Sequence, residues 1–125
     1  MRSLDIVFPE ARSVAILESD VPAPGVGEVR CRARTSLVST GTESFCLDGL
    51  FDAGTFWEEW VEYPFAPGYS MTSEVVDVGP GVNGLSVGDR VATSTPHSSV
   101  FVVPAADCLP VPDGVTDDQA CWTSL

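Results

Sequence analysis

The sequence has few basic residues and only one histidine. Six basic side chains stand against eighteen acidic ones, which gives a formal net charge of −12. This charge repels phosphate backbones and anionic lipid head groups, so neither nucleic acid nor a membrane is an expected partner. The single histidine, His97, has no metal-ligating neighbours in sequence, and we predict a hydrogen-bonded residue at a strand end instead of a metal ligand.

Zinc-type cysteine pairs, a signal peptide and a membrane span are also lacking. The four cysteines form no C-x-x-C pair, which excludes the usual structural zinc lobe. The first residues contain no apolar signal-peptide core, and no apolar run approaches the length of a membrane span. We therefore expect a reduced, cytoplasmic protein.

Glycine and proline are frequent in this sequence, and valine is its commonest residue. Eleven glycines and ten prolines in 125 residues favour short strands joined by tight turns, and few stretches keep a helical apolar period. The expected class is a single, mainly β domain with short helices.

Two segments carry the clearest strand patterns. Residues 28–35 alternate strictly, with apolar side chains on one face and three arginines on the other, where they are solvated, pair with acidic neighbours or contact a phosphate. Residues 4–18 predict a hairpin that turns at 9–12, with Val14 and Ile16 among its inward-facing residues. Between residues 73 and 91, three glycine turns separate further strands, and each glycine is expected where the backbone needs a positive φ.

Residues 46–65 hold six of the eleven aromatic side chains, separated by acidic residues. Thr55 with Glu58 predicts a short capped helix that places Trp57 and Trp60 on one side. Two interpretations stay open. The aromatic side chains either pack on the barrel as core, or they form the wall of a pocket for a flat or bulky substrate.

The last ten residues begin with a helix signal. Thr116 and Gln119 form a capping box, and the acidic residues between them suit the positive end of a helix. The residues that follow are too few for a stable isolated helix. We therefore expect the sequence to stop inside a helix.

Three ordered sequence motifs resemble the medium-chain dehydrogenase/reductase family. They are PFAPGYS at 64–70, EVVDVGPGV at 74–82 and GDRV at 88–91, which match P-x-x-x-G-H-E, E-V-V-x-V-G-x-G-V and G-D-R-V. A further motif, STGTE at 39–43, is similar to the C-G-[ST]-D segment of zinc alcohol dehydrogenases. It has the form found in a zinc-less subtype that includes the bacteriochlorophyllide dehydrogenase branch.

The resemblance implies a fold, a domain division and a cofactor. Residues 1–115 would form a GroES-like, partly open β-barrel on the substrate and catalytic side. Residues 116–125 would start the helix that leads to a Rossmann domain, which binds NADP or NAD and whose G-x-G-x-x-G motif is not in this sequence. The full-length protein would be a homodimeric oxidoreductase acting on a small-molecule substrate, and the 125 residues alone would be inactive.

The resemblance also implies the site residues. Thr40, Tyr69 and Ser70 stand where zinc-dependent members have metal ligands, and neutral hydroxyls are poor zinc ligands, so no metal residues and no zinc are expected. Thr42 matches the proton-relay hydroxyl, and Thr42 and Tyr69 are the candidate catalytic residues. Thr40, Gly41 and Thr42 are the candidate cofactor-binding residues. The candidate substrate pocket consists of Phe45, Trp57, Trp60 and Tyr69.

Three functional hypotheses follow. The leading one is the catalytic-side domain of an NAD(P)(H)-dependent, zinc-independent alcohol dehydrogenase or carbonyl/enoyl reductase. The alternative is a non-catalytic binding or accessory protein on the same scaffold. A co-chaperonin-like ring would share the barrel, but the capped helix at residue 116 argues against it.

Overall fold

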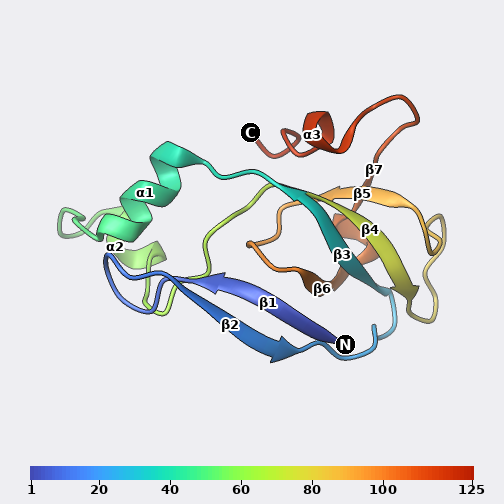
Figure 1. Cartoon of the computed structure of the whole chain (residues 1–125), viewed down its shortest axis with the longest axis horizontal. Coiled ribbons are helices and arrows are strands. Elements are labelled where there is room, and N and C mark those ends of the chain that lie inside the picture. The colour runs from blue at the N-terminus through green and yellow to red at the C-terminus, as the bar shows by residue number, and fades with distance from the viewer.

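The computed structural model describes residues 1–125 and is mainly β, as predicted. Two sheets and three short α-helices make up the chain (Figure 1). The strands are β1 (Arg2–Val7), β2 (Ala15–Asp20), β3 (Glu28–Ser36), β4 (Met71–Val78), β5 (Arg90–Thr93), β6 (Val100–Pro104) and β7 (Leu109–Pro110). The helices are α1 (Thr40–Asp48), α2 (Phe56–Trp60) and α3 (Asp117–Ala120), with a 3-10 turn η1 at Ala105–Asp107.

The five-stranded sheet has the order β6-β3-β4-β5-β7, and every neighbouring pair in it is antiparallel. The hairpin β1–β2 joins this sheet through the segment before β6. There the Ile6 amide donates to the His97 carbonyl over 2.9 Å, and the Ser99 amide donates to the Leu4 carbonyl over 2.9 Å. The two sheets thus form one partly open barrel. Antiparallel pairing by short connections explains why glycine and proline turns are so frequent.

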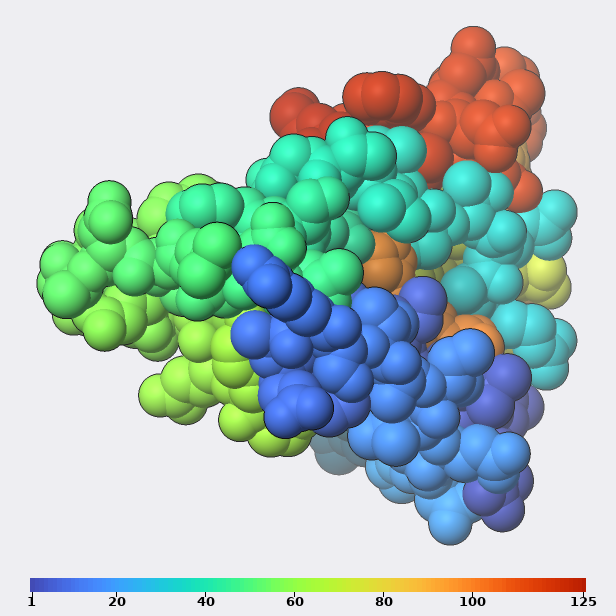
Figure 2. Space-filling model, turned by 60° about the vertical axis from the view of Figure 1, so that its left-hand side comes forward, coloured from blue at the N-terminus to red at the C-terminus, as the bar shows by residue number.

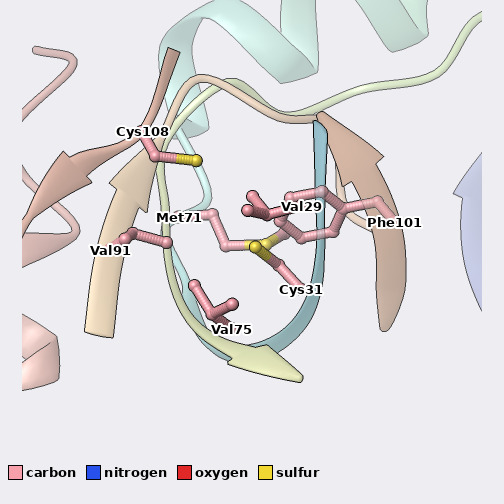
Figure 3. Packing of buried hydrophobic residues seen from close by; sticks show 7 residues of the cluster. All are labelled: Val29, Cys31, Met71, Val75, Val91, Phe101 and Cys108. Atoms are coloured by element: carbon pink, nitrogen blue, oxygen red, sulfur yellow. The ribbon is translucent and has the colours of Figure 1, made fainter. Parts of the chain in front are cut away.

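The main core lies between the strands of the larger sheet. β3 alternates as its sequence predicts, with Val29 and Cys31 fully buried and its three arginines on the outer face. Figure 3 shows the seven clustered side chains, which are Val29, Cys31, Met71, Val75, Val91, Phe101 and Cys108. The alternation of apolar residues in β3 therefore determines which face of this strand points into the barrel.

Two of the three outer-face arginines pair with acidic neighbours, one of the outcomes that the sequence left open. Arg30 contacts Asp77 at 2.9 Å, and Arg34 contacts Glu74 at 2.9 Å. Antiparallel pairing of β3 with β4 places these side chains on the same face of the sheet.

The predicted hairpin is confirmed, but the inward placement of two residues is wrong. β1 pairs with β2 around a turn at residues 9–13, with Ile6 opposite Ile16. Val14 is 57 % exposed and Ile16 is 68 % exposed. The hairpin is a separate two-stranded sheet, so the side chains of β2 have no second layer above them.

α1 and α2 lie together at one end of the molecule and form a second, smaller core with the hairpin (Figure 1). Its buried residues are Phe8, Cys46 and Val61. The capped helix expected after Thr55 is present as α2, although the Thr55 side chain makes no cap bond and instead donates to the Asp52 carbonyl over 2.7 Å. No helix in the structure has the length and apolar character that crossing a membrane requires.

The capping box at Thr116 and Gln119 is formed as predicted, and it starts α3. α3 packs against β3 and β4, and Asp117 makes the ion pairs of this contact. Asp117 contacts Arg34 at 2.7 Å and Arg90 at 2.9 Å, and its carbonyl accepts a bond of 3.0 Å from Thr72. Asp117 therefore links three strands of the large sheet to the C-terminal helix.

This link gives a prediction about pH. Arg34, and then Arg90, hold the pKa of Asp117 below its usual range. A carboxylate whose pKa is lowered by folding stabilises the protein above its ordinary value, and this contribution disappears as the pH falls below about 4. We expect Asp117→Asn to lower the Tm by a few degrees at pH 7 and by less at pH 3, measured by thermal unfolding. An equal loss at both pH values would contradict the role of the ion pairs.

Candidate functional site

Two loops meet at the end of the barrel where β3 ends and β4 begins. Ser36 pairs with Met71 in the sheet, and the Leu37 amide donates to the Ser70 carbonyl over 3.0 Å. The first loop runs directly into α1, and the second carries Tyr69 and Ser70. The structure thus brings the STGTE segment beside the segment that matches P-x-x-x-G-H-E, although the two are about thirty residues apart in sequence.

The three residues predicted to contact the cofactor form the first turn of α1. Thr40 and Gly41 are exposed, and Thr42 is half-buried. Ser39 occupies the N-cap position, but its side chain accepts no hydrogen bond from the helix. The first-turn N–H groups are therefore not occupied by a side-chain cap, and they lie at the positive end of the helix dipole.

Tyr69 and Ser70 have different environments. Tyr69 is half-buried, and its hydroxyl makes no hydrogen bond within the chain. Ser70 is buried, and its hydroxyl donates to the carbonyl of Cys121 just after α3. Ser70 therefore fixes the C-terminal segment to the barrel, whereas the Tyr69 hydroxyl is free to contact another molecule.

The three side chains at the positions of the family's zinc ligands do not suit a zinc ion. Zinc in proteins is held by thiolate, imidazole and carboxylate groups, and the matching positions hold Thr40, Tyr69 and Ser70. The chain contains no group of three His, Cys, Asp or Glu side chains placed to hold a metal ion.

A buried polar network lies directly behind these loops. His97 Nε2 is 2.8 Å from Glu43 Oε2, and both side chains are less than 10 % exposed. The other ring nitrogen, Nδ1, contacts the hydroxyl of Ser36 at the end of β3. Glu43 Oε1 accepts a bond of 2.9 Å from the Ser39 amide. The sequence predicted a hydrogen bond at a strand end for His97, but it did not predict that His97 pairs with Glu43.

Two cavities are lined in part by His97. One, of about 250 Å³, lies between the hairpin and α1, and the other, of about 280 Å³, lies between the hairpin and β3. Both are also lined by Ile6 and Val38. Figure 2 shows a recess between the blue hairpin and the teal segment that follows β3, with orange surface at its base.

Cys46 lies on the buried face of α1 and is fully enclosed. Burial, and to a smaller extent the carboxylate of Glu43, raises the pKa of its thiol. A thiol with a raised pKa stays protonated and is a poor nucleophile or metal ligand at neutral pH. Cys46 is therefore a packing residue.

The aromatic residues of the predicted substrate pocket are only partly brought together. The rings of Phe45 and Trp57 meet edge to face at 5.0 Å, and those of Trp57 and Trp60 lie 5.7 Å apart. Trp57 packs on the smaller core, whereas Phe45 is 38 % and Trp60 is 41 % exposed. None of the four cavities in the structure is lined by these three residues or by Tyr69.

The comparison with protein families decides the lineage. Residues 33–114, about two thirds of the chain, match the family model described as the alcohol dehydrogenase GroES-like domain. The chain belongs to this family. It is the N-terminal domain type of the medium-chain dehydrogenases/reductases, as the four motifs predicted, and the matched region contains all of them.

Known relatives of this GroES-like domain include dehydrogenases and reductases. L-threonine 3-dehydrogenase of Pyrococcus abyssi is 35 % identical over 89 residues, which are 68 % of this chain and 23 % of that protein. A quinone oxidoreductase of Pseudomonas syringae pv. Tomato DC3000 has a TM-score of 0.69 at 27 % identity, over 95 % of this chain and 36 % of that one. The CurK enoyl reductase shares the fold, with a TM-score of 0.80 at 16 % identity over 98 % of this chain and 39 % of that one. The chain spans about a quarter of the length of the curated dehydrogenases that it matches.

Proposed function

We propose that this chain is the substrate-side half of an NAD(P)(H)-dependent oxidoreductase that transfers hydride without zinc. The observation that carries the proposal is the meeting of two hydroxyl-bearing loops at one end of the barrel, joined by the bond from Leu37 to Ser70. Thr42 and Tyr69 supply neutral donors there. The reaction would be that of an alcohol dehydrogenase or a carbonyl/enoyl reductase, on a bulky or aromatic small molecule.

Hydrogen-bond donors replace the metal in this proposal. A carbonyl oxygen gains negative charge as hydride arrives, and donors fixed before the reaction stabilise that charge. The free hydroxyl of Tyr69 suits this role, and the hydroxyl of Thr42 would pass a proton to or from the same oxygen. The buried Glu43 needs no metal partner, because His97 and the Ser39 amide already occupy both of its oxygens.

NAD(H) or NADP(H) supplies the hydride when bound, and most of its contacts would come from a Rossmann domain after residue 115. In this division residues 1–115 form the substrate-side domain, and residues 116–125 begin the connection. The backbone N–H groups of Thr40, Gly41 and Thr42 would donate hydrogen bonds to the side of the dinucleotide that faces this domain. The substrate pocket would form once the second domain closes over this end, and its lining would consist of Phe45, Trp57, Trp60 and Tyr69. The four unpaired cysteines suit a reducing cytoplasm, and a homodimer is the expected assembly.

The test is direct detection of hydride transfer by the full-length protein. Reduced cofactor deuterated at both C4 positions of the nicotinamide would be offered with aldehydes, ketones and enones, whose products keep the transferred deuterium on carbon, and the products would be analysed by mass spectrometry. The proposal predicts deuterium in one product. Tight binding of such compounds without any deuterium transfer would favour a non-catalytic binding protein instead.

Tyr69 gives a separate prediction. Tyr69→Phe removes the free hydroxyl but keeps the ring, so we expect kcat to fall about tenfold, the equivalent of one hydrogen bond made in the transition state. Tyr63→Phe is the matched control, because the Tyr63 hydroxyl donates to the Cys46 carbonyl away from the two loops. Equal kcat values for Tyr69→Phe and the wild type would assign Tyr69 to packing alone.

A further inference from the structure

The Ser36–His97–Glu43 network joins three parts of the fold that are distant in sequence. Ser36 ends β3, Glu43 lies in α1, and His97 precedes β6. No other contact described above reaches from the β6 side of the barrel to α1. The network therefore acts as a tie between the barrel wall and the helix that carries Thr42.

The chemistry of the network fixes how the tie works. An ionised carboxylate can only accept hydrogen bonds, so the short contact between Nε2 and Glu43 requires a proton on Nε2. The same carboxylate accepts from the Ser39 amide at the N-cap of α1. His97 therefore fixes the position of the Glu43 carboxylate, and this carboxylate binds the amide of Ser39, the N-cap residue of α1.

The His97 ring is buried and held by contacts of two kinds. It packs on Gly68, where a Cβ atom would lie 2.8 Å from the ring carbons. Its two nitrogens contact Ser36 and Glu43. These hydrogen bonds fix the orientation of the ring within its packed surroundings.

We propose that His97 is a positioning residue, which acts through Glu43 to set the first turn of α1 and thereby the Thr42 hydroxyl. This inference rests on the proposed function, because it assigns Thr42 a role in the reaction. His97 comes from a different segment than the Tyr69-Ser70 loop, where zinc-dependent members of the family carry their histidine. The site thus gains a fixed geometry from an imidazole that contacts neither substrate nor metal.

The test uses two substitutions that separate the two nitrogens of the ring. In His97→Gln the side-chain amide reaches the position of Nε2 and can still donate to Glu43. In His97→Asn the amide reaches only the position of Nδ1, so it keeps the contact with Ser36 and loses Glu43. Each variant would be made in the full-length protein, and kcat and KM would be measured for the substrate with the highest turnover.

We expect His97→Asn to lower kcat by about 10- to 100-fold, as supporting residues of a site typically do, with KM unchanged. His97→Gln should recover most of that loss. Ser36→Ala should lower kcat less than His97→Asn does, because it removes the contact at Nδ1 but leaves the contact of Nε2 with Glu43. Equal kcat values for the asparagine and glutamine variants would overturn the proposal.

Hydrogen exchange provides a readout that does not require turnover. The peptide covering residues 37–48 contains the Ser39 and Glu43 amides, which bond to Glu43 Oε1 and to the Ser39 carbonyl. In His97→Asn this peptide should exchange faster than in the wild type, whereas in His97→Gln it should not. If this peptide exchanged at the wild-type rate in His97→Asn, the claim that His97 stabilises the start of α1 through Glu43 would be overturned. Faster exchange in a protein that transfers no hydride would instead show that the tie exists and that the proposed function fails.

Discussion

Replacing Thr42 by valine is expected to lower kcat by about 10²- to 10³-fold in the full-length protein. Valine has the shape of threonine but no hydroxyl, so the first turn of α1 keeps its packing and loses only the proposed proton carrier. Because the hydroxyl acts in the transition state, kcat and kcat/KM should fall together. Steady-state kinetics with NADH or NADPH in excess would measure this loss.

The matched control is Ser44→Ala, which removes an exposed hydroxyl from the same helix. It should leave kcat unchanged. Both variants should unfold at the wild-type temperature, since neither side chain makes a hydrogen bond within the chain. Full activity in Thr42→Val would remove Thr42 from the reaction and leave it as an ordinary helix residue.

Gly79→Ala is expected to produce the largest loss of stability. A Cβ atom at position 79 would lie 1.9 Å from the Gly25 carbonyl oxygen and 2.9 Å from that of Glu28. Both contacts are with backbone, which cannot move aside as a flexible side chain does. The Gly79 amide also donates to the Glu28 carbonyl over 2.8 Å, so relief of the clash would break this bond. We expect a loss of about 3 kcal/mol or more, and a fall in Tm of roughly 10 °C.

Gly41→Ala is the comparison variant, and it is expected to stabilise the protein. Nothing lies within 4 Å of a Cβ atom at position 41, and the residue is inside α1 with an ordinary helical φ. Alanine is the better helix former, so this variant should gain about 0.5–1 kcal/mol. Thermal unfolding followed by circular dichroism would measure both variants. Similar Tm values for the two would contradict the close approach at Gly79.

The strand and turn pattern was predictable because it depends on local chemistry. The alternation in 28–35 determines which face of β3 is buried, and the capping box determines where α3 begins. The glycine turns at 81, 84 and 88 have the expected positive φ. We predicted a positive φ for Gly79 as well, and this prediction is wrong. Residue 79 is glycine because the loop at Gly25 approaches its backbone, a contact that only the folded chain creates.

The exposure of β2 and the grouping of the aromatic residues depend on tertiary structure. Ile16 alternates as a buried residue would, but burial needs a covering layer, and the hairpin has none on that side. The aromatic segment divides between core and surface: Trp57 packs beneath α1, and Trp60 stays largely exposed. The spacing of the aromatic residues in the sequence cannot show which of them are core residues and which are exposed, because either arrangement would have the same spacing.

The site was only partly accessible to sequence reasoning. The motif matches identified the two loops and their hydroxyls, since those residues are close in sequence to the segments that carry the resemblance. The network behind them joins residues up to 61 positions apart, and no periodicity connects Ser36 to His97. The one available signal was the presence of a single histidine together with an acidic residue at 43 and no ligands for a metal.

The central claim is that these loops form half of a hydride-transfer site without a metal. The most direct measurement is the turnover and the zinc content of one full-length preparation, before and after dialysis against a chelator. We predict well below one zinc per chain and the same turnover in both samples. Turnover that disappears with the chelator and returns when zinc is added would contradict the claim.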